Sequence, residues 1–417
     1  MASGSVKDGR VARRHQRGAA LMLILVMVSL LVAMFAGIFV NDLVRQNQRQ
    51  ERTTNALAQA KQAMIGRAAS DDNRPGSLPC PDTDDDGSAE LFSGNDCPSY
   101  IGRLPWKSLG LPDLRDSDGE RLWYALSNNY RDHGTAEPIN SDTKGNRTVH
   151  SENTAVTLTT EAVAVIFAPG APLGTQDRHP STTALCPTTG TTIARQRCAA
   201  NYLDTTGGAN NATTAGAYVS AQHSNSFNDR LLLITTAELM PVVEQRVARE
   251  MLKVLQSYKA NSGCNCYPWP DLSTGFSDFG LNRGRIPGYD LAGTTVPPYA
   301  LPVDWGVSGA PTLPQWFIDN GWRRIIYYAV GRNFLESSGA GCTSCESGET
   351  TLRVNNVPGT EVVILTPGAA GAGRPVAYPW TGWSPYIEDP ENNDNSDDHY
   401  EIPSSSGYSR DRLYTIP

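Results

Sequence analysis

Hydrophobic positions are distributed very unevenly along the chain. Residues 19–40 read AALMLILVMVSLLVAMFAGIFV, a run without a charge or a proline. Because a helix rises about 1.5 Å per residue, this run is long enough to cross the ~30 Å hydrocarbon core of a bilayer once. The pattern therefore predicts one membrane-spanning helix near the start of the chain.

Helical periodicity continues past this run to about residue 70, with hardly a helix breaker before Gly66. Five apolar positions fall on one helical face: Leu43, Leu57, Ala60, Met64 and Ala68. The pattern predicts that 19–70 form a transmembrane and stem helix whose outer half has one apolar face.

The rest of the chain contains the same series of short motifs twice. The first series is LPCPD (78–82), GRLPW (102–106), GERLWYAL (119–126), TEAVAVIFAPGAPLG (160–174), NYLDTTGGANN (201–211) and NDRLLLIT (228–235). The second is YPWPD (267–271), GRIPG (284–288), GWRRIIYYAV (321–330), GTEVVILTPGAAGAG (359–373), PYIEDPENND (385–394) and SRDRLYTIP (409–417). Six motifs in one order indicate an internal repeat.

Each series follows a helical segment. Before the second series, 242–259 has apolar residues at helical spacing, and Thr236 is a candidate N-cap. The short segments rich in Val, Ile, Tyr and Trp are typical of antiparallel strands. We expect an α+β fold: a long N-terminal transmembrane and stem helix, then two tandem modules at 71–235 and 236–417. Each module is expected to pack one helix on a small antiparallel sheet.

The repeat also predicts equivalent positions within the two sheets. Asp229-Arg230 and Asp411-Arg412 are expected to enter the last strand of each sheet at the same place. Phe167 and Leu365 are likewise expected to occupy equivalent sites.

The charge distribution predicts on which side of the membrane each end of the predicted helix lies. The chain has 35 Lys and Arg against 43 Asp and Glu, a net charge of −8, so no basic surplus is left to bind nucleic acid. Residues 1–18 are nevertheless basic, with five Lys or Arg against Asp8. Under the positive-inside rule this leader stays in the cytoplasm, and the acidic body lies across the membrane.

The leader ends in Arg17-Gly18, and the apolar run begins Ala19-Ala20-Leu21-Met22-Leu23. An ordinary secretory signal has a shorter apolar core followed by a small-residue cleavage site. A basic leader that ends in Gly before a long apolar helix resembles the type IV pilin and pseudopilin superfamily. An uncleaved signal anchor is the alternative that hydropathy leaves open.

The resemblance implies cleavage after Gly18 by a prepilin peptidase and methylation of Ala19 as the new N-terminus. Most major pilins have Glu at the fifth mature position, where this chain has Leu23. That departure is similar to minor pilins and to the large K-type pseudopilin of type II secretion. The implied protein is a non-enzymatic minor subunit of a type IV pilus or type II secretion filament, with other pilins or pseudopilins as partners.

The implied location is the bacterial inner membrane, crossed once, with the body in the periplasm or on a surface filament. The alternative function is a membrane-anchored periplasmic or surface binding or adhesion protein. For that alternative, Trp380 and Trp383 are candidate contact residues, together with loops rich in Asp and Glu.

All eight cysteines lie beyond the predicted membrane helix, where oxidation is expected. The spacing predicts that Cys80 pairs with Cys97 and that Cys186 pairs with Cys198. The other four remain ambiguous. Cys342 and Cys345 either bond to each other or bond to Cys264 and Cys266, and a four-thiolate zinc site is the less favoured alternative.

The segment DTDDDGSAE contains Asp82, Asp84 and Asp86 at alternate positions, followed by Gly87. Three carboxylates at this spacing are typical of a loop that binds a hard cation, and the glycine permits the sharp turn. The sequence predicts a calcium site with Glu90 as a late ligand. The twelfth loop position is Ser93, so a full EF-hand is excluded. A solvated acidic loop is the alternative.

Catalytic motifs are missing from the chain. There is no GxSxG, HExxH or P-loop sequence, and the six histidines show no metal-ligand spacing. We therefore expect that the protein is not an enzyme.

Overall fold

The computed structural model describes these residues of the chain: 12–133, 138–152, 156–213, 217–261, 265–270, 282–287, 313–335, 351–369, 386–394, 398–403 and 410–417. Within these ranges, side chains are described except those of 12–20, 36–40, 42–43 and Arg324.

The helices are α1 (Ala12–Ser70), α2 (Thr236–Asn261), α3 (Gln315–Asp319) and α4 (Pro390–Asn393). Short 3-10 turns are η1 (Asn128–Tyr130), η2 (Arg195–Arg197), η3 (Ala199–Asn201), η4 (Trp322–Arg324) and η5 (Arg332–Phe334).

The strands before α2 are β1 (Ile101–Arg103), β2 (Trp123–Leu126), β3 (Arg147–Ser151), β4 (Thr157–Ala168), β5 (Ala184–Cys186), β6 (Thr191–Ile193), β7 (Thr205–Thr206), β8 (Ala209–Asn210), β9 (Tyr218–Ser220) and β10 (Arg230–Thr235). Those after it are β11 (Arg283–Arg285), β12 (Tyr327–Val330), β13 (Leu352–Val354), β14 (Val357–Thr360), β15 (Val362–Thr366), β16 (His399–Tyr400) and β17 (Arg412–Ile416).

The chain divides into two compact units, residues 1–55 and 56–417. Helix α1 has 59 residues and contributes to both units. In the first unit, the large apolar side chains described between Leu21 and Phe35 are all at least half exposed. Within the described part of the chain, no helix combines the length and the apolarity of a membrane span. The membrane span predicted at 19–40 is therefore not confirmed.

The second unit contains the end of α1, and there the predicted apolar face is buried. Leu57, Ala60, Met64 and Ala68 are at most 4% exposed and belong to the same hydrophobic core as Tyr124. Their positions repeat every three or four residues, so they form one stripe along the helix. The stem face predicted for these four residues is confirmed, whereas the side chain of Leu43 lies outside the described ones.

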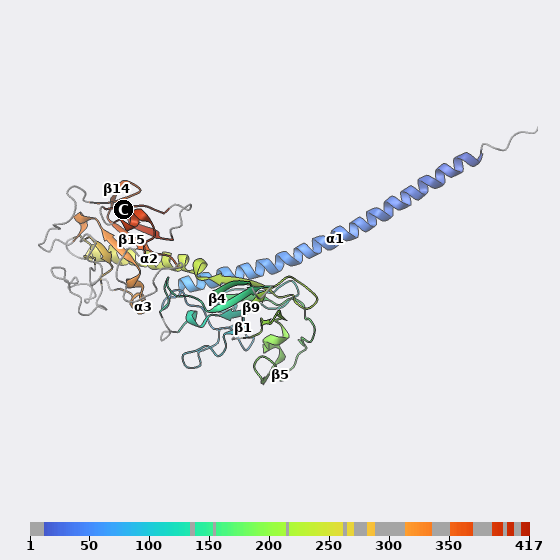
Figure 1. Ribbon diagram of the computed structural model, residues 1–417, viewed down its shortest axis with the longest axis horizontal. Coiled ribbons are helices and arrows are strands. Elements are labelled where there is room, and N and C mark those ends of the chain that lie inside the picture. The colour runs from blue at the N-terminus through green and yellow to red at the C-terminus, as the bar shows by residue number, and fades with distance from the viewer. Residues whose placement is uncertain are drawn as a thin grey trace, which may run out of the picture. The chain divides into compact units, whose positions relative to one another are not determined.

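The first sheet has the strand order β1-β2-β4-β3-β9, and β10 pairs with β4 as well. Neighbours are antiparallel except for β3 and β9, which run parallel. The strands after α2 repeat this order: β11-β12-β15-β17 form one sheet, and β14-β13-β16 form another with a parallel β13-β16 pair. The predicted α+β class is confirmed. Figure 1 shows the two groups of strands in different colours along the chain.

The register of the two groups agrees with the predicted equivalences. Phe167 lies between Trp123 on β2 and Leu231 on β10. Leu365 lies between Tyr327 on β12 and Leu413 on β17. Each final strand begins with its arginine, since Arg230 pairs with Ala168 and Arg412 with Thr366.

Hydrogen bonds outside the strands repeat as well. The Tyr124 hydroxyl donates to the carbonyl of Pro79 at 3.2 Å, and the Tyr328 hydroxyl donates to that of Pro268 at 3.1 Å. Both tyrosines are completely buried. Each bond ties the Pro-containing motif that follows a helix to the second strand of the adjoining sheet, which explains why both motifs keep their place in the series.

The entry of each final strand is fixed by a buried carboxylate. Oδ2 of Asp229 accepts from the backbone N–H of Asp204 at 2.8 Å, and Asp204 Oδ2 accepts from that of Asn228 at 2.7 Å. We call this pair of carboxylate–backbone hydrogen bonds an aspartate lock, and a second one lies at the end of the chain. Oδ2 of Asp411 accepts from the N–H of Glu388 at 2.8 Å, and Glu388 Oε2 accepts from that of Arg410 at 2.8 Å.

A fully buried asparagine accompanies each lock. The side-chain amide of Asn211 exchanges two hydrogen bonds with the backbone of Val219 in β9. That of Asn392 exchanges two with the backbone of Glu401 beside β16. The two halves of the second unit thus share side-chain locks as well as strand order.

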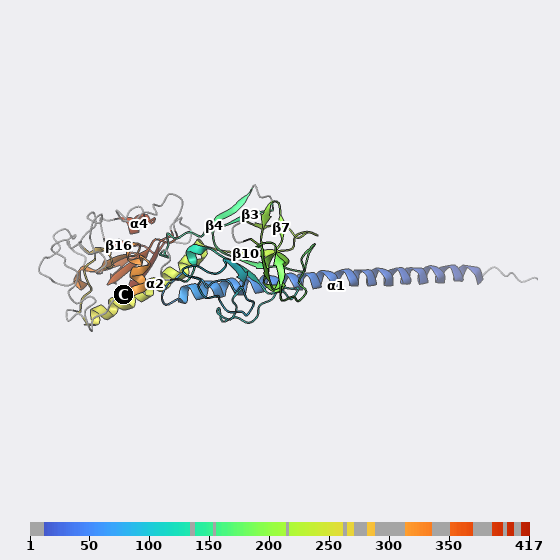
Figure 2. The same cartoon turned by 90° about the horizontal axis from the view of Figure 1, so that it is seen from below.

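Helix α2 lies against β4 and β10 of the first sheet and against β15 and β17 of the second (Figure 2). Its residue Glu244 is completely buried and accepts from two hydroxyl groups. The donors are Ser141, which precedes β3, and Thr366 at the end of β15, whose Oγ1 lies 3.1 Å from Glu244 Oε2. Since a buried carboxylate is costly without donors, this residue ties both sheets to one helix. Contacts of this kind join 56–417 into one compact unit, and the module boundary predicted near Thr236 stays a prediction.

The Asp204–Asp229 lock makes stability depend on pH. Burial, followed by the nearby charge of Asp204, raises the pKa of Asp229 well above its usual value. The unfolded state therefore ionises first, and the native protein loses stability as pH rises from about 4 through the raised pKa. We expect Asp229→Asn to raise the free energy of unfolding at pH 7 by on the order of 1 kcal/mol, because the amide keeps the acceptor oxygen without the charge.

Urea unfolding of the full chain between pH 3.5 and 7.5 measures this effect. The gain of Asp229→Asn over wild type should vanish below about pH 4 and grow above it. Asp118→Asn, at an exposed position, is the matched control and should follow wild type. A variant that loses more stability at pH 7.5 than at pH 3.5 would show instead that the charged form of Asp229 supports the fold.

Candidate functional site

The acidic loop Asp82–Gly87 lies between the end of α1 and strand β1. One oxygen each from Asp82, Asp84 and Asp86 can be chosen so that the three lie within 4.8 Å of one another. Asp82 is buried, whereas Asp84 and Asp86 are exposed. Three carboxylate oxygens at this spacing could hold a metal ion from the solvent side.

Backbone amides fold the loop around the first carboxylate. Oδ1 of Asp82 accepts from the N–H groups of Asp84 and Asp85, and Oδ2 accepts from that of Gly87 at 2.7 Å. Burial raises the pKa of Asp82 above its usual value, although these hydrogen bonds oppose the shift. Asp86 has the opposite shift, because the N–H of Ser88 binds its carboxylate and lowers its pKa.

Two residues of the loop have left-handed backbone conformations. Asp85 has φ +67° and Gly87 has φ +87°. A Cβ at Gly87 would lie only 2.5 Å from the indole nitrogen of Trp106, so glycine is required for space as well as for φ. These two turns direct the side chains of Asp84 and Asp86 to the same side as Asp82.

Arginines hold the loop from outside the triad. Oδ1 of Asp85 lies 2.9 Å from Arg121 Nη1 and 3.6 Å from Arg103 Nε. Arg121 also pairs with Asp113 at 2.9 Å, and these carboxylates raise its pKa. Asp85 is therefore a structural anchor, which leaves the other three aspartates to face the ion position.

Glu90, predicted as a late ligand, points elsewhere. Its Oε1 accepts from the backbone N–H of Thr83 at 3.0 Å and from the Thr83 hydroxyl at 2.5 Å. Glu90 is not part of the acidic triad. In the structure Glu90 closes the loop at Thr83, and its role as a late calcium ligand stays a prediction.

Disulfides fasten the regions around the loop. Cys80 and Cys97 are bonded, as are Cys186 and Cys198, which confirms both predicted pairs. Cys266 is disulfide-bonded as well, which is incompatible with a four-thiolate zinc site. Cys264, Cys342 and Cys345 lie outside the described residues, so the pairing of the last four cysteines stays open.

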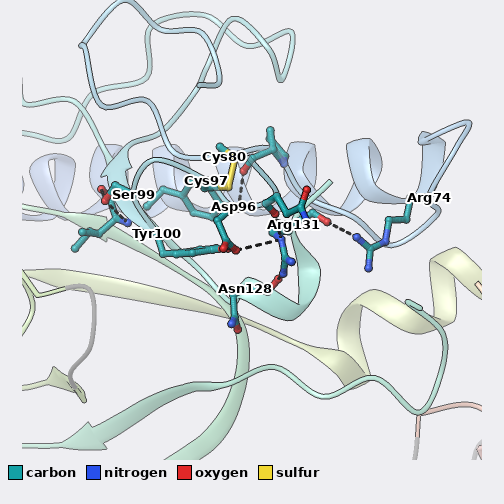
Figure 3. The surroundings of a disulfide bond; sticks show 12 residues. Arg74, Cys80, Asp96, Cys97, Ser99, Tyr100, Asn128 and Arg131 are labelled. Carbon is teal, nitrogen blue, oxygen red and sulfur yellow. Dashed lines mark hydrogen bonds and ion pairs between the residues drawn. A yellow bond between two sulfur atoms is a disulfide. The ribbon is translucent and has the colours of Figure 1, made fainter. Parts of the chain in front are cut away.

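The Cys80–Cys97 bond encloses the acidic loop and is itself held by polar contacts (Figure 3). Asp96 Oδ1 accepts from the Tyr100 hydroxyl at 2.7 Å and lies 3.5 Å from Arg131 Nε. The carbonyl of Arg131 in turn accepts from Arg74 at 2.8 Å. The loop is thus attached at its base to the end of α1 and to the turn after β2.

The other acidic clusters have structural roles. Asp116 is buried and accepts from the N–H groups of Asp118, Glu120 and Gly170, which closes a turn. Asp389 is the N-cap of α4, where its carboxylate accepts from Glu391 and Asn392. Neither cluster presents three carboxylates to one point among the described residues.

The leader-cleavage residues and the two candidate tryptophans stay predictions. Gly18 and Ala19 lie within α1, but their side chains are not described, and Trp380 and Trp383 lie outside the described residues. Sequence reasoning missed Arg103 and Arg121, which are separated from Asp85 in the sequence and reach it only in the fold. The signal that could have indicated Arg103 is the repeated Gly-Arg motif, since Arg285 has the equivalent place on β11.

No protein-family model, curated protein or solved structure matches this chain. The interpretation of the site therefore depends on its own geometry.

The triad geometry predicts stabilisation by a divalent cation. With a dissociation constant of 0.1–1 mM, typical of extracellular calcium sites, 10 mM Ca²⁺ would stabilise the native state by about 1.4–2.7 kcal/mol. The melting temperature of the full chain should then rise by several degrees relative to chelator. Asp84→Ala should abolish the rise, because Asp84 is exposed and contributes mainly to the ion position.

Asp118→Ala removes an exposed aspartate from the neighbouring acidic turn and should keep the calcium response. Equal melting temperatures in calcium and in chelator for the wild-type protein would identify the triad as a solvated acidic loop.

Proposed function

We propose that this protein is a minor pilin or pseudopilin-like subunit of a type IV pilus or type II secretion filament. The observation that supports this most is the composition of α1. The helix exposes an apolar segment near its start, and its last turns provide the buried helix of an α+β head. In such filaments the apolar segment anchors the subunit first and packs among other subunits later.

The exposed segment needs a covering. Every large apolar side chain described between Leu21 and Phe35 is 50–69% exposed. Exposed apolar area costs about 25 cal/mol per Å², so a patch of this length requires lipid or neighbouring helices around it. We propose that 19–40 span the inner membrane before assembly and pack against other pilins or pseudopilins afterwards.

The repeated sheet supports a large, two-headed subunit. Strand order, register and the Asp229 and Asp411 locks recur in the second unit, and we propose that they arose by duplication of one head. A second head adds bulk that a repeating shaft subunit lacks. Together with Leu23 in place of the usual Glu, this favours a position at or near a filament tip.

Location and chemistry follow from the same features. Disulfides form and persist outside the cytoplasm, so the two bonds indicate an extracytoplasmic body. We propose that this body is periplasmic or on the surface filament, that calcium binds the acidic triad as a structural ion, and that the subunit is not an enzyme.

Processing of the leader tests the proposal. We expect the exported protein to begin at Ala19, because prepilin peptidases cut after the glycine that separates the basic leader from the apolar helix. N-terminal sequencing and intact-mass measurement of the membrane form give the result directly. Gly18→Leu should leave the leader in place.

Gly9→Leu alters another glycine of the leader and should be processed normally. Shearing of the cells provides a second criterion, since a filament subunit is released together with the other pilins. A protein that keeps Met1 and stays in the membrane after shearing would instead be an anchored binding or adhesion protein.

A further inference from the structure

A polar pocket of about 450 Å³ lies within the second unit, away from the acidic triad. One side is formed by Asn73, Arg74 and Asp132, which follow α1 and η1. The other side is formed by α3 and the residue after it, through Gln315, Trp316, Asp319 and Asn320. Its volume is within the range of small-molecule sites, about 300–1,000 Å³.

The charged groups of the pocket are already paired. Asp132 Oδ2 lies 3.4 Å from Arg67 Nη2, and Asp319 Oδ1 accepts from Gln315 Nε2 at 2.7 Å. Arg74 is 3% exposed and donates from Nη1 to the carbonyls of Arg131 and His133. Arg74 and Asp132 place opposite charges on the same side of the pocket, so this side favours an uncharged ligand over a cation or an anion.

The uncharged ligand must nevertheless be rich in hydrogen-bonding groups. Carboxylates accept from hydroxyl groups, and the side-chain amides of Asn73 and Gln315 both donate and accept. Five of the seven lining side chains are carboxylates or carboxamides, and a purely apolar ligand would exclude water from them without offering a hydrogen bond in return.

Trp316 adds one flat apolar surface. Its side chain is half-buried, and the Arg246 guanidinium lies 5.8 Å from the ring centroid. The backbone around it is fixed, because its carbonyl accepts from Asn320 Nδ2 at 2.8 Å and the adjacent Phe317 is fully buried. An indole beside carboxylates and amides suits a ligand with an apolar face and a polar rim.

We propose that this pocket binds a sugar ring of a neutral oligosaccharide. A pyranose presents C–H groups on one face, which can stack on Trp316, and hydroxyl groups around its edge, which can bond to Asp132, Asp319 and Asn73. The pocket joins residues that precede α2 in the sequence with residues that follow it. This inference is independent of the proposed filament role.

The experiment titrates the full chain with chitotriose, the neutral β-1,4-linked trimer of N-acetylglucosamine, in a detergent without sugar head groups. Saturation-transfer difference NMR detects contact with the ligand, and calorimetry gives the dissociation constant. Trp316→Leu removes the stacking surface, and Asn73→Trp fills the pocket from an exposed position. Each should weaken binding at least tenfold.

Asp118→Asn and Trp316→Phe are the controls, and both should stay within threefold of wild type. Thermal melting establishes that each variant is folded, and Asn73→Trp keeps the test informative if Trp316→Leu is not. Absence of chitotriose binding to wild type, or binding that neither pocket variant weakens, would overturn the proposal. Tighter binding of free arginine or glutamate than of chitotriose would overturn it as well, since those ligands are charged.

Discussion

The structure of the second unit depends on the need to cover one face of each small antiparallel sheet. Sheets of this size are not stable with both faces in water, and here a helix supplies the missing layer each time. The last turns of α1 cover the first sheet, and α2 contacts both sheets. Because α2 serves two sheets, apolar residues from Leu57 to Ile416 belong to one continuous core.

Because α2 packs on both sheets, its orientation relative to each must also be fixed, and apolar packing alone is not directional. Buried polar contacts fix this orientation. Glu244 accepts from Ser141, which precedes α2 in the sequence, and from Thr366, which follows it, and each final strand is fixed by its own aspartate lock. Such contacts contribute little net stability, but they penalise any shifted packing that would leave a buried carboxylate without donors.

The order of the motifs along the chain was enough to predict the sheets. The contacts around the candidate site join residues far apart in sequence, so most of them could not be predicted from it. The repeated motifs placed Phe167 with Leu365 and Arg230 with Arg412, because turn residues and strand periodicity are local signals. Glu90 was predicted as a calcium ligand from its spacing alone. In the structure one of its carboxylate oxygens accepts from both the backbone N–H and the hydroxyl of Thr83. The support from Arg121 and the pocket around Trp316 bring together residues far apart in sequence, which no local pattern encodes.

The two similar groups of strands differ in the strand that contains Val163 or Glu361. Strand β4 runs through Val163 as one strand with a shift in its register to β10, whereas its counterpart is divided at Glu361 into β14 and β15. Glu361 occupies the place of buried Val163, and its carboxylate instead pairs with Lys259 of α2 at 2.7 Å and accepts from the Tyr267 hydroxyl at 2.7 Å. Glu361 is suited to packing against α2, which has Lys259 in its last turn, whereas Val163 is suited to the apolar face of α1. The ion pair with Lys259 therefore gives the second sheet a polar contact with α2 that the apolar Val163 cannot provide in the first.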